Sequence, residues 1–153
     1  MIGSGDVVVV DIGGTMPSGY CSDCTRTYVV GHVPHGFADY YRVLLSAQEA
    51  ATLSVRPGVT AESVDQAARK IITDAGYGEW FIHRTGHGIG LESHEDPYIV
   101  EGNTIPLENG MAFSIEPGIY PGPHGARIED IVVCTEDGVQ RMNNARRDLV
   151  IIV

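Results

Sequence analysis

Five ionisable side chains interrupt five separate apolar or glycine-rich segments, and any fold of this chain must bring them to polar partners. They are Asp11, Asp23, His87, Glu116 and Glu129. Burying an unpaired carboxylate costs on the order of several kcal/mol. Four hard carboxylates and one imidazole suit a pair of divalent metal ions, which can activate a water molecule for hydrolysis. We therefore expect these segments to converge on a metal site.

The two aspartates lie on a predicted antiparallel hairpin. Residues 7–14 form a β-branched run that ends in Gly-Gly, and residues 20–30 follow a turn rich in proline and glycine. Asp11 ends the apolar part of the first strand and Asp23 lies in the middle of the second, so a hairpin lets both face one side. Alternatively, Asp11 caps a turn and Asp23 pairs with Arg26.

Two helices are expected after the hairpin. Apolar residues recur at helical spacing over residues 37–55, and Pro57-Gly58 ends that segment. Thr60 is a suitable N-cap for a second helix over residues 61–75, and Gly76 is placed to end it.

The rest of the chain predicts short strands separated by glycine and proline. The clearest are residues 111–115 and 126–135, and residues 150–153 form a possible last strand. The expected class is α+β, with one curved, largely antiparallel sheet and helices on one face. We treat residues 1–153 as part of one domain.

The second pair of carboxylates lies near the end of this region. Arg127 and Glu129 point to the same face of a strand because side chains alternate along it. Glu116 ends a strand before Pro117-Gly118, which places it at a sheet rim or in a cleft. A solvent-exposed strand end is the alternative for Glu116.

Three histidines lie within a glycine-rich stretch: His83, His87 and His94. Glycine permits close approach of the backbone to a ligand. His87 and His94 are seven positions apart, so they would face opposite ways on a flat strand. The chain must bend between them if both serve one site.

Composition excludes several classes of protein. The net charge is −10 and no basic patch is present, which argues against nucleic-acid binding. No apolar run could span a membrane, and the start lacks a signal-peptide pattern. Cys21, Cys24 and Cys134 are too few for a disulfide framework, which favours a reducing, cytoplasmic location. The CxxC lacks the further ligands that a structural zinc site needs.

Five motifs, taken in order, resemble the catalytic domain of the M24 metallopeptidases, which have the pita-bread fold. The motifs are VVVVDIGG, YCSDCTRTYVVG, HRTGHGIGLESHEDP, FSIEPGIY and GARIEDIVV. The contexts DCTRT and RIED resemble the Xaa-Pro branch, prolidase and aminopeptidase P, more than the methionine aminopeptidases.

This resemblance implies two divalent metal ions, Mn(II) first and Co(II) or Zn(II) as alternatives. It implies that Glu116 also takes a proton from the attacking water, that His94 stabilises the developing charge, that His83 is a second active-site histidine and that Arg127 braces the ligands. The implied metal ligands are Asp11, Asp23, His87, Glu116 and Glu129.

The implied function is hydrolysis of the bond before proline in a peptide substrate. The alternatives are a catalytically incompetent fragment that binds metal or assembles, and a methionine aminopeptidase. Asp11 and Asp23 are 12 positions apart, one more than the family pattern. The resembled domain also has a segment before Asp11. We therefore expect a chain that lacks the N-terminal part of the fold, exposes apolar surface and forms a homo-oligomer.

Overall fold

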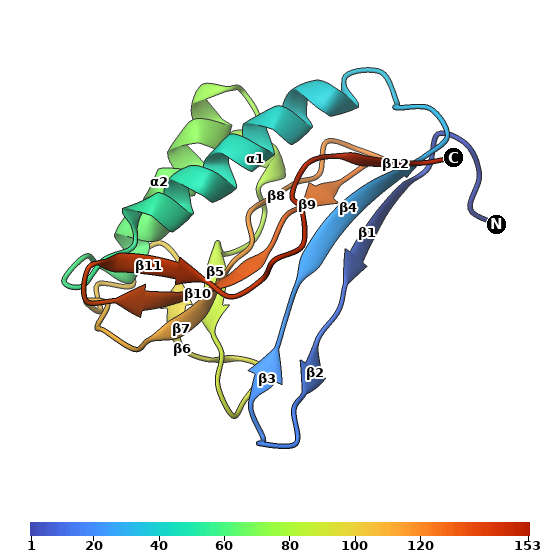
Figure 1. Cartoon of the computed structure of the whole chain (residues 1–153). Coiled ribbons are helices and arrows are strands. Elements are labelled where there is room, and N and C mark those ends of the chain that lie inside the picture. The colour runs from blue at the N-terminus through green and yellow to red at the C-terminus, as the bar shows by residue number, and fades with distance from the viewer.

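Two helices lie side by side on one face of the β-structure in the computed structural model, which describes residues 1–153 (Figure 1). Helix α1 spans Phe37–Ser54 and helix α2 spans Ala61–Asp74. The Thr60 hydroxyl accepts a hydrogen bond from the Ser63 amide at 3.3 Å, as expected of an N-cap. Both predicted helices are confirmed, each ending one residue earlier than expected.

The strands are short, and a 3-10 turn, η1 (Gly78–Trp80), precedes the later ones. Their bounds are β1 Val7–Asp11, β2 Gly14–Thr15, β3 Cys21–Ser22, β4 Thr25–Val30, β5 Gly86–Gly88, β6 Glu95–Ile99, β7 Ala112–Ile115, β8 Gly118–Ile119, β9 Ala126–Arg127, β10 Asp130–Thr135, β11 Gly138–Arg141 and β12 Val150–Ile152.

Hydrogen bonds divide these strands into a five-stranded sheet, a three-stranded sheet and two short ladders. The five-stranded order is β11-β10-β7-β5-β6, with antiparallel neighbours throughout. The three-stranded order is β1-β4-β12, in which β12 runs parallel to β4. This arrangement confirms the α+β class with a largely antiparallel sheet and helices on one face.

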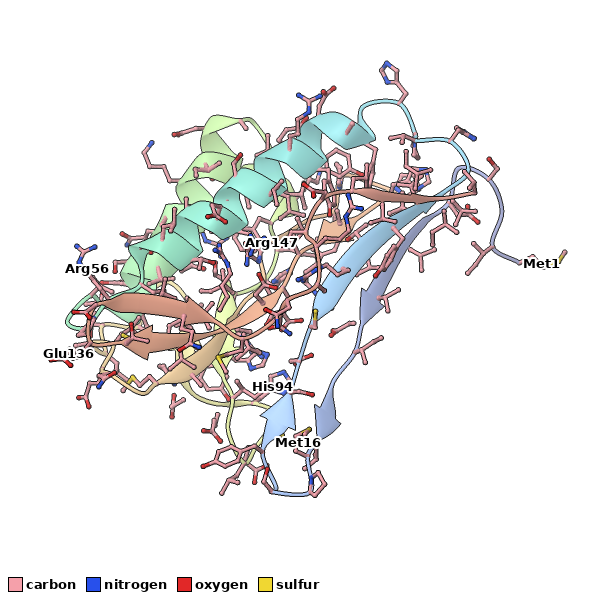
Figure 2. All side chains as sticks on the ribbon, in the orientation of Figure 1. Met1, Met16, Arg56, His94, Glu136 and Arg147 are labelled. Atoms are coloured by element: carbon pink, nitrogen blue, oxygen red, sulfur yellow. The ribbon has the colours of Figure 1, made fainter.

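The β1–β4 pair continues into β2 and β3, which form a hairpin that projects away from the helices (Figure 1). Met16 lies at its tip (Figure 2). The hairpin prediction is confirmed, but neither strand is continuous. β1 ends at Asp11 and β2 begins at Gly14, while β3 ends at Ser22 and β4 begins at Thr25, so Asp23 lies in a break and not in mid-strand.

A second break separates β9 from β10 at Ile128 and Glu129. The two breaks face each other, because the Glu129 amide donates to the Thr25 carbonyl at 3.1 Å. Each break coincides with two consecutive polar residues, Ser22-Asp23 and Glu129-Asp130, which interrupt the alternation of apolar and polar residues.

The hydrophobic core lies between the helices and the sheets. Phe37 and Leu44 of α1, Ile72 of α2 and Phe113 and Ile115 of β7 are almost fully buried in it. A bilayer-spanning helix is not found, because none combines the necessary length with sufficient hydropathy.

Candidate metal centre

Asp11 ends β1, and Asp23 lies close to it in the break between β3 and β4. Asp11 lies opposite Thr25 in the β1–β4 register, and Ile12 and Cys24 exchange two backbone hydrogen bonds across the break. A Cβ at Gly13 would lie 3.0 Å from the Ser22 carbonyl oxygen, so glycine eases the close approach of the two segments beside Asp23. Burial and the Asp11 charge raise the pKa of Asp23.

His87 lies at the centre of β5 and is almost completely buried. Its Nδ1 lies 3.0 Å from the Gly88 carbonyl oxygen, which can only accept, so Nδ1 carries the proton and Nε2 faces the carboxylates. Glycine is required on both sides: a Cβ at Gly86 would lie 1.9 Å from the Ser114 carbonyl oxygen, and one at Gly88 would lie 2.3 Å from that of Asp96. The tight packing therefore fixes the position of the imidazole.

Glu129 is 1% exposed, and the Thr25 hydroxyl donates to its Oε2 at 2.7 Å. Burial, reinforced by the negative charges of Glu116 and Asp23, raises the pKa of Glu129 to about 8. Ionising a carboxyl group that is buried among negative charges costs little free energy only when a cation lies beside it.

Glu116 follows β7 and contacts the imidazole directly. Its Oε1 lies 3.2 Å from His87 Nε2 and accepts a hydrogen bond from the Ser114 hydroxyl at 3.0 Å. Burial alone would raise the pKa of Glu116, but His87, Ser114 and the Arg127 charge together lower it. The side chain is mostly buried, so the alternative of a solvent-exposed strand end is wrong.

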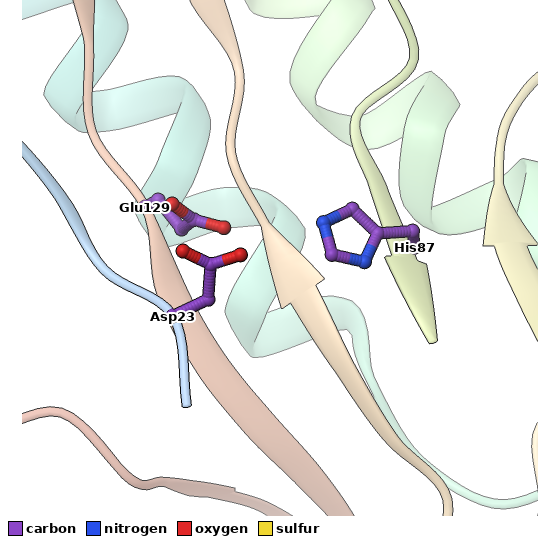
Figure 3. Close-up of side chains that lie close together, drawn as sticks. All are labelled: Asp23, His87 and Glu129. Carbon is purple, nitrogen blue, oxygen red and sulfur yellow. The ribbon is translucent and has the colours of Figure 1, made fainter. Parts of the chain in front are cut away.

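Three of the five predicted ligands form a compact group. One donor atom each of Asp23, His87 and Glu129 lies within 4.8 Å of the other two (Figure 3). Glu116 contacts His87 in this group, and the Asp11 carboxylate lies near Asp23. Oxygen donors with one imidazole, and a buried carboxyl group whose charge lacks compensation, fit divalent metal ions.

The Arg127 guanidinium links the carboxylates of Asp11 and Glu116 to the Thr25 hydroxyl of β4. Its guanidinium lies 2.5 Å from Asp11 and 3.8 Å from Glu116, and its Nε donates to the Thr25 hydroxyl at 3.2 Å. The same hydroxyl donates to Glu129, so Arg127 and Glu129 do reach one side despite the break in the strand. Asp11 is therefore an ion-pair partner and not a turn cap.

The other two predicted histidines lie beside the metal centre. The His94 ring is 4.0 Å from the His87 ring, because β5 and β6 fold back on each other as an antiparallel pair. The predicted bend is therefore present. His83 lies 2.9 Å from the Tyr120 hydroxyl through Nε2. Both histidines line an open cleft of about 870 Å³, together with Asp11, Arg84, Tyr98, Val100, Glu116 and Arg127.

Sequence reasoning did not single out Thr25 or Tyr120 as site residues. Thr25 links Arg127 to Glu129, and the Tyr120 hydroxyl lies between His83 and Arg127. Thr25 lies within the motif DCTRT and Tyr120 within FSIEPGIY. Their position in these motifs is the only feature of the sequence that points to them.

The sequence also did not predict a network of hydrogen bonds and an ion pair that begins on helix α2. Asp65 is fully buried, binds Arg69 through both oxygens and accepts from the Thr85 amide and hydroxyl. Arg69 donates to the His83 carbonyl, and the Thr85 carbonyl accepts from the Glu116 amide. Helix α2 thereby fixes the position of the backbone segments that carry His83, His87 and Glu116.

Behind Glu129, a second network engages Arg26, so the alternative pairing of Asp23 with Arg26 is not found. Arg26 lies 2.6 Å from the fully buried Asp130 and donates to the Glu129 carbonyl at 2.5 Å. Arg147 binds the other oxygen of Asp130 at 2.9 Å. Asp23 is thus free of Arg26 and turns toward the metal centre.

Comparison with known proteins shows extensive similarity. The sequence profile of metallopeptidase family M24 matches residues 1–136. A probable dipeptidase PepE of Mycobacterium tuberculosis is 59% identical over 149 residues, which are 97% of this chain and 40% of that protein. An Xaa-Pro dipeptidase of Lactobacillus delbrueckii subsp. lactis is 51% identical over 148 residues, 96% of this chain and 40% of that protein.

A solved structure agrees closely with this fold. The crystal structure of dipeptidase PepE from Mycobacterium ulcerans superposes with a TM-score of 0.96 at 59% identity, and the match covers 99% of this chain and 41% of that one. This chain spans about 40% of the length of the curated relatives it matches.

Proposed function

The chain belongs to metallopeptidase family M24, and from this premise we propose that it takes part in hydrolysis of the peptide bond before proline. The similarity to the Xaa-Pro dipeptidase of Lactobacillus delbrueckii supports this substrate class. Because that similarity covers only part of the relative, both an Xaa-Pro dipeptidase and an Xaa-Pro aminopeptidase are compatible with it. The pita-bread fold expected from the sequence is confirmed by the dipeptidase structure.

The observation that carries the proposal is the convergence of Asp23, His87 and Glu129, whose donor atoms lie within 4.8 Å of one another. With Asp11 and Glu116 beside them, these residues would hold two divalent metal ions. We favour Mn(II) over Co(II) and Zn(II), because four of the five donors are carboxylates. Bound ions of this kind supply Lewis-acid activation of water and of the scissile carbonyl.

Glu116 is the proposed proton acceptor for the attacking water. Its pKa is lowered by His87, Ser114 and Arg127 despite burial, so the group is ionised and able to accept a proton. The Ser114 hydroxyl and the Arg127 guanidinium hold its two oxygens in place.

His94 is the proposed donor to the charge that develops on the scissile oxygen. It is exposed in the cleft directly beside the His87 ring, where an incoming carbonyl can reach it. His83 lies on the same cleft, held by Tyr120, and Arg127 holds Asp11 in position. These three residues act by orientation and hydrogen bonding.

We further propose that the protein works in the reducing cytoplasm and forms a homo-oligomer. All three cysteines are free thiols. Ile12, Met16, Tyr20 and Leu91 are more than half exposed, and large exposed apolar surfaces drive association.

Metal titration and peptide cleavage test the proposal. We expect wild-type protein to bind Mn²⁺ in calorimetry, and Asp23→Ala, His87→Ala and Glu129→Ala to lose at least one ion. Glu136→Ala, on the exposed turn before β11, is the matched control. Unchanged stoichiometry in the three variants would refute the ligand assignment.

Cleavage decides between the candidate functions. With Mn²⁺ bound, Xaa-Pro peptides should be hydrolysed in preference to Met-Ala peptides. Preference for Met-Ala would identify a methionine aminopeptidase. Metal binding without hydrolysis of either peptide would identify a metal-binding or assembly module.

A further inference from the structure

Asp23 differs from the other clustered carboxylates in what holds it. Asp11, Glu116 and Glu129 each accept a hydrogen bond from another side chain. The Asp23 carboxylate is instead held by the amide of the next residue, Cys24, at 3.0 Å. The position of this carboxylate therefore depends on the path of its own backbone.

That backbone lies in the break between β3 and β4, where the strand ladder does not fix it. The Asp23 carbonyl makes no hydrogen bond to another backbone group. It accepts one from the side-chain amide of Asn143, Nδ2, at 2.9 Å. A side chain from the far end of the chain thus supplies the contact that a continuous strand would have made at this position.

The same side chain also holds the strand that follows Glu129. Asn143 Oδ1 accepts a hydrogen bond from the Ile131 amide at 2.6 Å. Backbone pairing past the end of β11 stops with the bond from the Met142 amide to the Ile131 carbonyl at 2.9 Å. The Asn143 side chain continues that pairing, and it thereby links the segments that carry Asp23 and Glu129.

The segment that carries Asn143 is itself held in place. It joins β11 to β12, and the Arg26 guanidinium donates to its carbonyl groups at Ala145 (2.7 Å) and Arg146 (2.9 Å). The same guanidinium donates to the Glu129 carbonyl. Because this segment is already anchored behind the metal centre, ordering the Asn143 side chain costs little further conformational entropy.

We propose that Asn143 is a positioning residue of the metal centre, whose side-chain amide sets the placement of Asp23 relative to Glu129 and thereby the affinity for the ion that both would hold. This inference rests on the proposed function. Groups that orient metal ligands from behind typically contribute about 10- to 100-fold to metal affinity. The next residue, Asn144, is exposed and its side chain has no hydrogen-bond partner within the chain, so it offers a matched comparison.

Calorimetric titration with Mn²⁺ compares wild type with Asn143→Leu, in which a side chain of similar size can make neither hydrogen bond. This variant should bind one Mn²⁺ ion about 10- to 100-fold more weakly. At a Mn²⁺ concentration that saturates wild type, its EPR spectrum should show a single ion in place of a coupled pair. Asn143→Ala avoids added apolar bulk at this position and should show the same loss. Asn144→Leu should bind Mn²⁺ as wild type does.

Two further measurements separate positioning from a general loss of stability. The Ile131 amide should exchange its hydrogen faster in Asn143→Leu and not in Asn144→Leu, because only the first variant lacks the acceptor. Thr60→Ala removes the N-cap of α2 and should unfold at a lower urea concentration, while its Mn²⁺ affinity stays at the wild-type value. All titrations use protein that circular dichroism shows to be folded.

Weaker binding of one ion that is confined to the two Asn143 variants supports the inference. Wild-type affinity in these variants would overturn it. An equal loss in Asn144→Leu or Thr60→Ala would also overturn it, because metal affinity would then follow stability and not the placement of Asp23. If wild type itself binds no Mn²⁺, the proposed metal centre is refuted and this inference with it.

Discussion

Replacing Glu129 with glutamine should stabilise the metal-free protein at high pH and weaken its stabilisation by metal. The carboxyl group is 1% exposed, and burial with neighbouring negative charge raises its pKa from 4.5 to about 8. The folded state therefore holds this proton after the unfolded chain has released it. Stability must fall as pH rises from about 4.5 to about 8, and it stays low above that range.

The size of the stability difference follows from the two pKa values of Glu129. Each pKa unit corresponds to ~1.36 kcal/mol, so full ionisation of Glu129 costs the metal-free fold at most ~5 kcal/mol. Glutamine keeps the shape of the side chain and can still accept the hydrogen bond from Thr25. Wild type and Glu129→Gln should thus be nearly equal in stability near pH 4.5, and the variant should be more stable by up to ~5 kcal/mol at pH 9.

Urea unfolding in the presence of EDTA, followed by circular dichroism at pH 5, 7 and 9, measures this difference. Asp23 and His87 also have raised pKa values, so wild type alone would mix several groups, whereas the difference between the two proteins isolates Glu129. Glu136→Gln, on an exposed turn, is the control and should follow wild type at every pH. Saturating Mn²⁺ should reverse the order at pH 7, because wild type binds at least one ion more than the variant and gains the corresponding stability. A difference that does not vary with pH would refute the reasoning.

Three further predictions concern the surroundings of the centre. Asp65→Asn leaves the Arg69 guanidinium without its charged partner, so urea unfolding should show a loss of about 3 kcal/mol. Gly86→Ala forces a Cβ against the Ser114 carbonyl and should cost about 3 kcal/mol in the same assay, whereas Gly14→Ala, with its nearest neighbour 4.0 Å away, should cost much less. His94→Ala should keep its stability and its Mn²⁺ stoichiometry but hydrolyse Xaa-Pro peptides ~10²-fold more slowly. Loss of an ion in this last variant would make His94 a metal ligand.

Local sequence signals were sufficient for the helices. Thr60 and the apolar spacing after it define α2 to within a residue of its end, because capping and amphipathicity are properties of neighbouring positions. The convergence of Asp23, His87 and Glu129 could also be expected, since each is an ionisable group in an apolar segment that needs a cation.

Features that depend on contacts between distant segments could not be read locally. The breaks at Asp23 and Glu129 lie beside each other in the fold, although they are more than 100 positions apart in the sequence. The same applies to Asp65, which looks like an ordinary exposed residue of a helix until Thr85 and Arg69 are brought against it. The parallel pairing of β12 with β4 likewise depends on the C-terminal segment returning to the edge of β4.

The wide separation of the three clustered donors affects the order of events during folding. Positions 23, 87 and 129 come together only when the hairpin, β5 and the strand after β9 have all reached their final places. Contacts between such distant positions form at a high cost in chain entropy. A cation captured at this point is therefore bound mainly after the rate-limiting step. It should prolong the lifetime of the folded protein by slowing unfolding, with little effect on the refolding rate.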